Sequence, residues 1–171
     1  MVIRPIINVR SDKLSHGFTE AVKLCRELSS DKTGVILDLA EVHFVSPSFL
    51  LPVIVYMHQL GFPINMINIG TYLSTVSFSD GGIDAASFAR SSAFKSYMES
   101  YSSKSYIPII KFPTDLDGSD KRNTILQCID NILSRQVPFA NNVILALKYV
   151  IGEVVDNIIE HACSEFGYIM A

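Results

Sequence analysis

The sequence predicts an α/β protein in which helices pack on sheets, and three observations support this class. Short β-branched runs alternate with helical patterns over residues 1–70, and helices that connect neighbouring strands favour parallel strand pairs. Residues 106–171 place a strand, two long helical patterns and a last strand in succession, as in an α+β unit. Hydrophobic residues make up 49% and charged residues 18% of the 171 residues, which is typical of a well-buried core.

The first 70 residues are expected to form strand, helix, strand, helix and strand. Strands are predicted at residues 3–9, 34–39 and 64–69, with a further short strand or turn at 42–45. Between the first two strands, apolar residues recur three and four positions apart, which predicts an amphipathic helix. Its apolar face comprises Phe18, Ala21, Val22, Cys25 and Leu28.

The most apolar stretch, residues 44–57, raises the question of a membrane span, because the mean hydropathy of the chain is +0.30. Its unbroken apolar run covers only residues 49–57, whereas a spanning helix needs ~20 residues. We therefore expect a helix that is buried on most sides and no membrane partner. Ser46 or Ser48 would bond its first N–H groups, Pro52 would lie near its first turn, and Gly61 would follow its end.

The rest of the chain is expected to contain a second domain. A loop is predicted at residues 77–82 and a helix at 85–101, and the four serines within residues 100–105 mark 101–105 as a linker. This divides the chain into domains at 1–100 and 106–171. The second domain is expected to have a strand at 106–112, a helix at 122–136 and a long helix from about 142 to 163, capped by Asn141 or Asn142. Another strand would begin at Tyr168.

Charge and cysteine usage exclude several classes of protein. The 14 Lys+Arg and 17 Asp+Glu residues give a net charge of −3 without a basic patch, so nucleic acid is not an expected partner. Cys25, Cys128 and Cys163 are far apart and odd in number, which favours buried free thiols in a reducing compartment. No signal-peptide pattern follows Met1. We therefore expect a cytoplasmic protein.

A line of polar residues lies within the last, otherwise apolar helix. Glu153, Asn157 and His161 are four residues apart, so they share one face of the helix, and Asp156 and Glu160 form a neighbouring line. Such a line can be an ordinary solvated face. However, crowded carboxylates repel unless a cation compensates them. A hard cation such as Mg²⁺ takes oxygen ligands together with phosphates, and a nearby carboxylate could act on a water molecule.

Two further residues of this helix bear on the same point. No Lys or Arg follows Lys148, whereas a solvated face usually mixes both signs of charge. Gly152 lies in the middle of the helix, where glycine costs about 1 kcal/mol relative to alanine. A close approach of another backbone would account for this glycine.

Residues 153–162 resemble the N-box of the GHKL ATPase superfamily, which includes histidine kinases and anti-sigma-factor kinases. The resemblance rests on the pattern Glu-x-x-x-Asn-x-x-x-His after a strand and a helix, and it covers about residues 106–171. It implies that Asn157 binds the Mg²⁺ of Mg-ATP. It also implies that Glu153 is the candidate general base, which orients a water or an attacking hydroxyl, and that His161 binds near the phosphates.

The same resemblance implies that residues 1–171 are an N-terminal fragment. In that superfamily a DxGxG box, a second glycine-rich segment and a mobile lid follow the N-box, and none of them occurs here. Mg-ATP is therefore implied only for a complete protein, which could be an ATPase or a kinase. Residues 1–171 alone are expected to bind no cofactor and to be inactive.

Residues 35–49 resemble STAS domains of the anti-sigma-factor-antagonist type, which have a mixed sheet covered by helices. The resemblance rests on a strand that ends in Asp-Leu, a hydrophobic turn and a serine-containing start of a helix. In the switchable members, the first serine of D-S-S-G is phosphorylated by a GHKL kinase. Here Pro47 occupies that position, Ser46 replaces the Asp and Ser48 matches the second serine. The phosphorylation switch is therefore expected to be absent.

Together the two resemblances imply a bacterial-type signalling regulator that joins a STAS-like interaction domain to a GHKL ATP-binding domain. Its partner would be another protein, or the STAS-like domain would contact the ATPase part within the chain. A homodimer is a further option, because a strand edge near Tyr168 could pair with another chain. Two alternatives remain: a non-enzymatic STAS-like interaction module and a small-molecule sensor.

Overall fold

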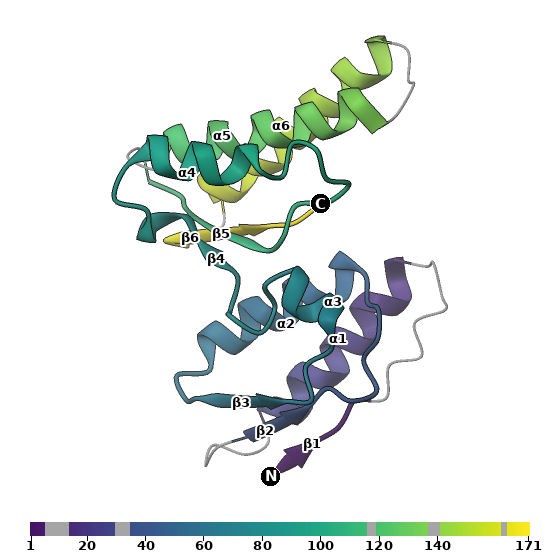
Figure 1. Ribbon diagram of the computed structural model, residues 1–171. Coiled ribbons are helices and arrows are strands. Elements are labelled where there is room, and N and C mark those ends of the chain that lie inside the picture. Colours follow the sequence, from purple (N-terminus) through teal and green to yellow (C-terminus); the bar gives the residue numbers. More distant parts are fainter. Residues whose placement is uncertain (6–13, 30–34, 116–118, 137–140, 162–163) are drawn as a thin grey trace. The chain divides into compact units, whose positions relative to one another are not determined.

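The computed structural model describes residues 1–5, 14–29, 35–115, 119–136, 141–161 and 164–171. These residues form helices and two small sheets, which confirms the predicted α/β class (Figure 1). The chain divides into two compact units, Met1–Ile83 and Asp84–Ala171. The division lies well before the linker expected at 101–105.

The first unit contains a parallel sheet. Its strands β1 (Val2–Ile3), β2 (Val35–Asp38) and β3 (Ile64–Ile67) are ordered β1-β2-β3. Both pairings are parallel, and Ile36 lies opposite Val2 on one side and Asn65 on the other. This confirms the parallel pairs predicted from the alternation of strands and helices. Figure 1 shows the helices of this unit on one side of the sheet. Most of the strand expected at residues 3–9 lies outside the described residues.

Helix α1 (Leu14–Leu28) is amphipathic as predicted, but its buried face is rotated from the expected one. Ala21, Leu24 and Leu28 are buried, whereas Phe18 is 56% exposed. The rotation has a steric reason at Gly17, where an added Cβ would lie 2.4 Å from Ser48 Oγ. The smallest residue of the helix thus faces the start of the next helix and allows a close approach.

Helix α2 (Pro47–Gln59) is the predicted apolar helix, and Phe49, Leu50, Val53 and Ile54 are buried along it. Its first residue is Pro47, so Pro52 lies inside the helix and not in its first turn as expected. Pro52 has no N–H for the carbonyl of Ser48, and this omission normally weakens a helix. Among the described residues, no helix combines the length and the apolar character that a bilayer crossing needs.

The loop before α2 and the segment after β3 contact each other in a way that the sequence did not indicate. A short helix, α3 (Thr71–Thr75), follows β3, and residues 42–45 form no strand although Val42 and Val45 are buried. Tyr72 of α3 donates a hydrogen bond from its hydroxyl to the carbonyl of Val45. Val42 and Val45 are therefore buried within a loop that contacts α3, whereas Phe44 of the same segment is exposed.

The second unit contains another small sheet, in the order β4-β5-β6. Its strands are β4 (Ile83–Asp84), β5 (Ile110–Pro113) and β6 (Phe166–Ile169), and β5 and β6 are antiparallel. Phe112 lies opposite Gly167, where an added Cβ would come within 2.4 Å of the Phe112 ring. The ring occupies the space of a side chain at Gly167, so this pairing requires glycine.

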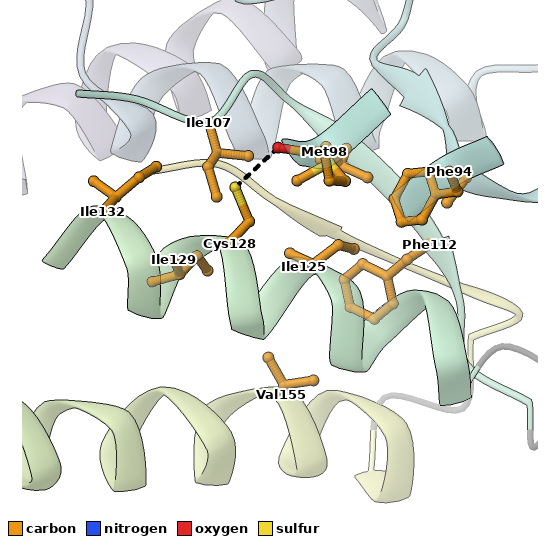
Figure 2. Packing of buried hydrophobic residues seen from close by; sticks show 11 residues of the cluster. Phe94, Met98, Ile107, Phe112, Ile125, Cys128, Ile129, Ile132 and Val155 are labelled. Atoms are coloured by element: carbon orange, nitrogen blue, oxygen red, sulfur yellow. Dashed lines mark hydrogen bonds between the residues drawn. The ribbon is translucent and has the colours of Figure 1, made fainter. Parts of the chain in front are cut away.

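Three helices pack with this sheet: α4 (Ser91–Glu99), α5 (Ser119–Gln136) and α6 (Asn141–His161), and a short 3-10 helix, η1 (Ala85–Ser87), precedes them. Figure 2 shows their shared core, in which α5 lies between α6 and the segments of Met98 and Ile107. The buried residues include Phe94, Met98, Ile107, Phe112, Ile125, Cys128, Ile129, Ile132 and Val155. The helix expected at 122–136 is thus confirmed within α5, and the helix expected at 85–101 is shorter than predicted.

The expected linker at residues 101–105 lies inside this second unit. The Tyr101 ring is 5.4 Å from the Tyr97 ring and 5.9 Å from the Tyr106 ring. Cys128 Sγ on α5 donates a hydrogen bond of 3.3 Å to the carbonyl of Met98 (Figure 2). Because aromatic side chains anchor the serine-rich turn, its composition alone does not make it a boundary.

Candidate functional site

Helix α6 carries the predicted site residues and is attached to the second unit along one side. Val155 is buried against the core that α5 and the sheet share, and Ile151 and Ile158 are half-buried against it. Lys148 Nζ lies 2.6 Å from Asp130 Oδ1 of α5. One side of α6 is therefore fixed by apolar packing and by an ion pair.

The predicted site residues lie away from this attached side. Glu153, Asn157 and His161 are all exposed, and they follow each other at intervals of one helical turn, about 6 Å along the axis. Asp156 and Glu160 are exposed beside them. We call these five residues the polar stripe. The fold brings the three predicted residues together on one helix and leaves their side chains open to solvent.

The polar stripe is acidic and has little internal compensation. His161 Nε2 lies 3.8 Å from Glu160 Oε2, and α6 contains no Lys or Arg besides Lys148. Lys148 is already paired with Asp130 on the α5 side. A cation bound from solvent would therefore meet carboxylate and amide oxygens here, which are the ligand types that Mg²⁺ takes.

The stripe does not form a metal site by its own side chains. Within the part of the chain that the structure describes, no group of three or more His, Cys, Asp and Glu residues is arranged to hold a metal ion. Mg²⁺ commonly uses one or two protein ligands together with the phosphates of a substrate. Asn157 fits that mode of binding, in which a bound phosphate completes the coordination.

The groove between α5 and α6 is a different feature. It has a volume of about 360 Å³, and its lining includes Leu126 and Asp130 of α5 and Lys148 and Ile151 of α6. The polar stripe lies outside this lining. The predicted site residues therefore lie on an exposed face of α6 and do not line this groove.

Gly152 does not have the role that the sequence suggested. No heavy atom lies within 4 Å of a Cβ built at this position, apart from the backbone of the helix itself. In the part of the chain that the structure describes, then, no other backbone approaches Gly152. Gly152 therefore lowers the stability of the helix, and no steric contact in this structure requires a glycine there.

The start of α2, where the STAS resemblance placed its serines, is held by backbone rather than side-chain caps. Ser46 occupies the N-cap position but makes no side-chain cap, contrary to one of the two expectations. The amides of Phe49 and Leu50 donate to the backbone carbonyl of Ser46 at 3.0 and 3.1 Å. The hydroxyls of Ser46 and Ser48 instead bond each other at 2.6 Å. Gly17 of α1 lies against both hydroxyls, and Pro47 between them has no hydroxyl to phosphorylate.

A polar cluster lies at the carboxyl ends of β1, β2 and β3, and the sequence patterns did not predict it. Asp38 is only 1% exposed, and its carboxylate accepts hydrogen bonds from three residues. Arg4 Nε lies 2.7 Å from Oδ2, and Asn68 Nδ2 and the Ala40 amide lie 2.9 and 3.1 Å from Oδ1. These hydrogen bonds, first that of Asn68 and then that of Arg4, lower the pKa of Asp38. The signal was an acidic residue at the end of an apolar strand.

The cysteines differ in their surroundings. Cys128 is buried as predicted, and burial raises the pKa of its thiol. Cys25 of α1 is only half-buried, because the buried face of this helix is rotated away from it. Burial raises the pKa of the Cys25 thiol as well. Cys163 lies outside the described residues. The described thiols are therefore poor nucleophiles at neutral pH.

No protein-family model, curated protein or solved structure matches this chain.

Proposed function

We propose that the second unit is the front part of a GHKL-type ATP-binding domain, joined to a STAS-like interaction unit in a signalling regulator. One observation carries the proposal: α6 is attached by one side, while Glu153, Asn157 and His161 lie exposed in a line on the rest of the helix. The sequence pattern of the N-box and the strand–helix–helix–strand order from β5 to β6 support it.

The chemistry of the polar stripe fits this role. Asn157 would supply an amide oxygen to Mg²⁺, and the phosphates of ATP would supply further oxygens. Glu153, one turn before Asn157, would orient a water or hydroxyl toward the terminal phosphate. His161, one turn after Asn157, would bond a phosphate oxygen. The carboxylates of the stripe would then be compensated by the bound cation.

An equilibrium binding experiment tests the proposal. The glycine-rich boxes are absent from residues 1–171, so this chain should show no thermal shift with 5 mM Mg-ATP. A chain that also carries those boxes should bind Mg-ATP, and Asn157→Ala should weaken the binding at least about 100-fold, because truncation of a phosphate–metal ligand removes a charge-assisted contact.

Asn123→Ala is the matched control, since Asn123 is also an exposed asparagine but belongs to α5. Its affinity for Mg-ATP should equal that of the parent chain. Equal affinity of the Asn157→Ala variant, or a clear shift of residues 1–171 with Mg-ATP, would contradict the assignment of the N-box.

One observation favours the interaction module as a second candidate. An open groove of about 400 Å³ lies between α1 and α2, and Phe18, Val22, Pro52 and Val55 contribute to its apolar lining. Such a groove suits a protein or peptide surface better than a charged nucleotide. If the longer chain folds but does not bind Mg-ATP, the interaction module becomes the preferred function, and the small-molecule sensor has no separate support.

A further inference from the structure

The first two-thirds of α6 expose apolar side chains that the described part of the second unit leaves uncovered. Val143, Val150 and Val154 are 40%, 56% and 54% exposed, and Leu147 between them is half-buried. We call these four residues the apolar stripe. Leu145 and Tyr149 are also exposed, on another side of the same helix. Contiguous exposed apolar residues on one helix indicate a contact surface.

The four residues share one face of the helix. Successive steps along the apolar stripe are four, three and four residues, and this spacing keeps side chains in line on an α-helix. The same spacing continues to Asn157 and His161. The apolar part of the line therefore ends at Val154, and the line continues with Asn157 and His161 of the polar stripe.

This spacing is the same when it is read from either end. If a second α6 lies antiparallel, with a two-fold axis level with the midpoint between Leu147 and Val150, then Val143 faces Val154 of the second copy and Leu147 faces Val150 of the second copy. A two-fold contact requires such self-complementarity, because each surface must fit itself. Four residues in the 3–4 spacing are those that pack between paired helices.

Charge favours the antiparallel arrangement over the parallel one. In the antiparallel pair, Glu153 is level with residue 144, in the first turn of the second helix, where free N–H groups carry partial positive charge. In a parallel pair, Glu153 would be level with Glu153 of the second copy, and His161 with His161 of the second copy. The like charges of the glutamates would then repel each other.

We propose that α6 is the interface of a symmetric homodimer, in which the apolar stripes of two chains pack antiparallel. Asn157 and His161 lie beyond the level at which the second α6 begins, whereas Glu153 is level with its first turn. The proposal rests on the apolar stripe and not on the Mg-ATP assignment. A contact of one helix pair is smaller than a standard interface, so we expect a dissociation constant of about 10–100 μM.

Sedimentation velocity of the reduced 171-residue chain, from about 1 to 500 μM, measures this equilibrium. Val150→Glu should weaken the dimer at least about 10-fold, because it places a carboxylate in the apolar contact. Tyr149→Glu is the matched control: Tyr149 is the adjacent residue and is 68% exposed, but it lies about 100° away around the helix. This variant should dimerise like the parent chain. A parent chain that stays monomeric at 500 μM, or equal losses in both variants, would overturn the proposal.

Disulfide trapping tests the register. With Cys25 and Cys163 replaced by serine, a chain that carries both Val143→Cys and Val154→Cys should form a cross-linked dimer on mild oxidation. Either substitution alone should not, because identical residues of the two antiparallel helices are about 16 Å apart along the axis, beyond the reach of a disulfide. A cross-link in a single variant would indicate the parallel arrangement, and no cross-link in the double variant would exclude the contact.

Discussion

Asp38 shows how one residue closes the end of a parallel sheet. A buried carboxylate is tolerated only when hydrogen bonds and charge compensate its lost hydration. Arg4, Ala40 and Asn68 together supply these donors from the ends of β1, β2 and β3. Asn68 adopts φ 55°, a left-handed conformation that asparagine tolerates better than most residues. The cluster therefore joins three strands through one side chain.

The lowered pKa of Asp38 predicts an acid-sensitive first unit. The folded state binds the Asp38 proton more weakly than the unfolded chain, whose pKa is near the ordinary value of 3.8. The stabilisation is complete above about pH 5 and is lost as the pH falls through the lowered pKa of the folded state. Asp38→Asn should lower the midpoint of urea unfolding at pH 7 and reduce its dependence on pH below 5. An unchanged midpoint at pH 7 would contradict this role.

Two glycines of the second unit should respond oppositely to alanine. Gly152→Ala should raise the free energy of unfolding by about 1 kcal/mol, because alanine favours the helix and its Cβ meets open space. Gly167→Ala should lower it by about 2 kcal/mol, because the Phe112 ring occupies the space of that Cβ. Urea unfolding monitored by circular dichroism measures both. Destabilisation by Gly152→Ala would show that this helix position is constrained after all.

At the scale of elements, α6 depends on a narrow line of packing. Val155 is 4% exposed and its neighbour Val154 is 54% exposed. Two adjacent valines of one helix therefore lie on its buried side and on its solvent side. The cluster around Val155 includes Ile125 and Ile129 of α5 (Figure 2). This line keeps the polar stripe and the apolar stripe turned outward.

Val155→Ala should destabilise the second unit by about 1–2 kcal/mol, because it leaves a cavity between α6 and the core. Val154→Ala is the matched control and should change the free energy of unfolding by less than about 0.5 kcal/mol. Both should be measured by urea unfolding at about 1 μM, where the chain is expected to be monomeric. Equal effects of the two substitutions would contradict the assigned faces of α6.

The chain as a whole divides into two compact units. The described core of the second unit draws its buried residues from Ala85 to Val155, and Asp38 stabilises the sheet of the first unit. We expect two transitions in differential scanning calorimetry: Asp38→Asn should lower the temperature of one and Val155→Ala that of the other. If both substitutions shift a single common transition, the units unfold together.

Patterns in the sequence were enough to predict the α/β class, the parallel pairs of the first sheet, the apolar helix α2, the helix at 122–136 and the helical line of Glu153, Asn157 and His161. These features depend on periodicity along the chain, which neighbouring residues impose on each other. Tertiary contacts, in contrast, establish which side of α1 is buried, that residues 101–105 belong to the second unit, that Asp38 binds Arg4 and Asn68, and that Gly152 faces open space. Each of these depends on residues distant in sequence coming into contact, and local pattern carries no record of such contacts.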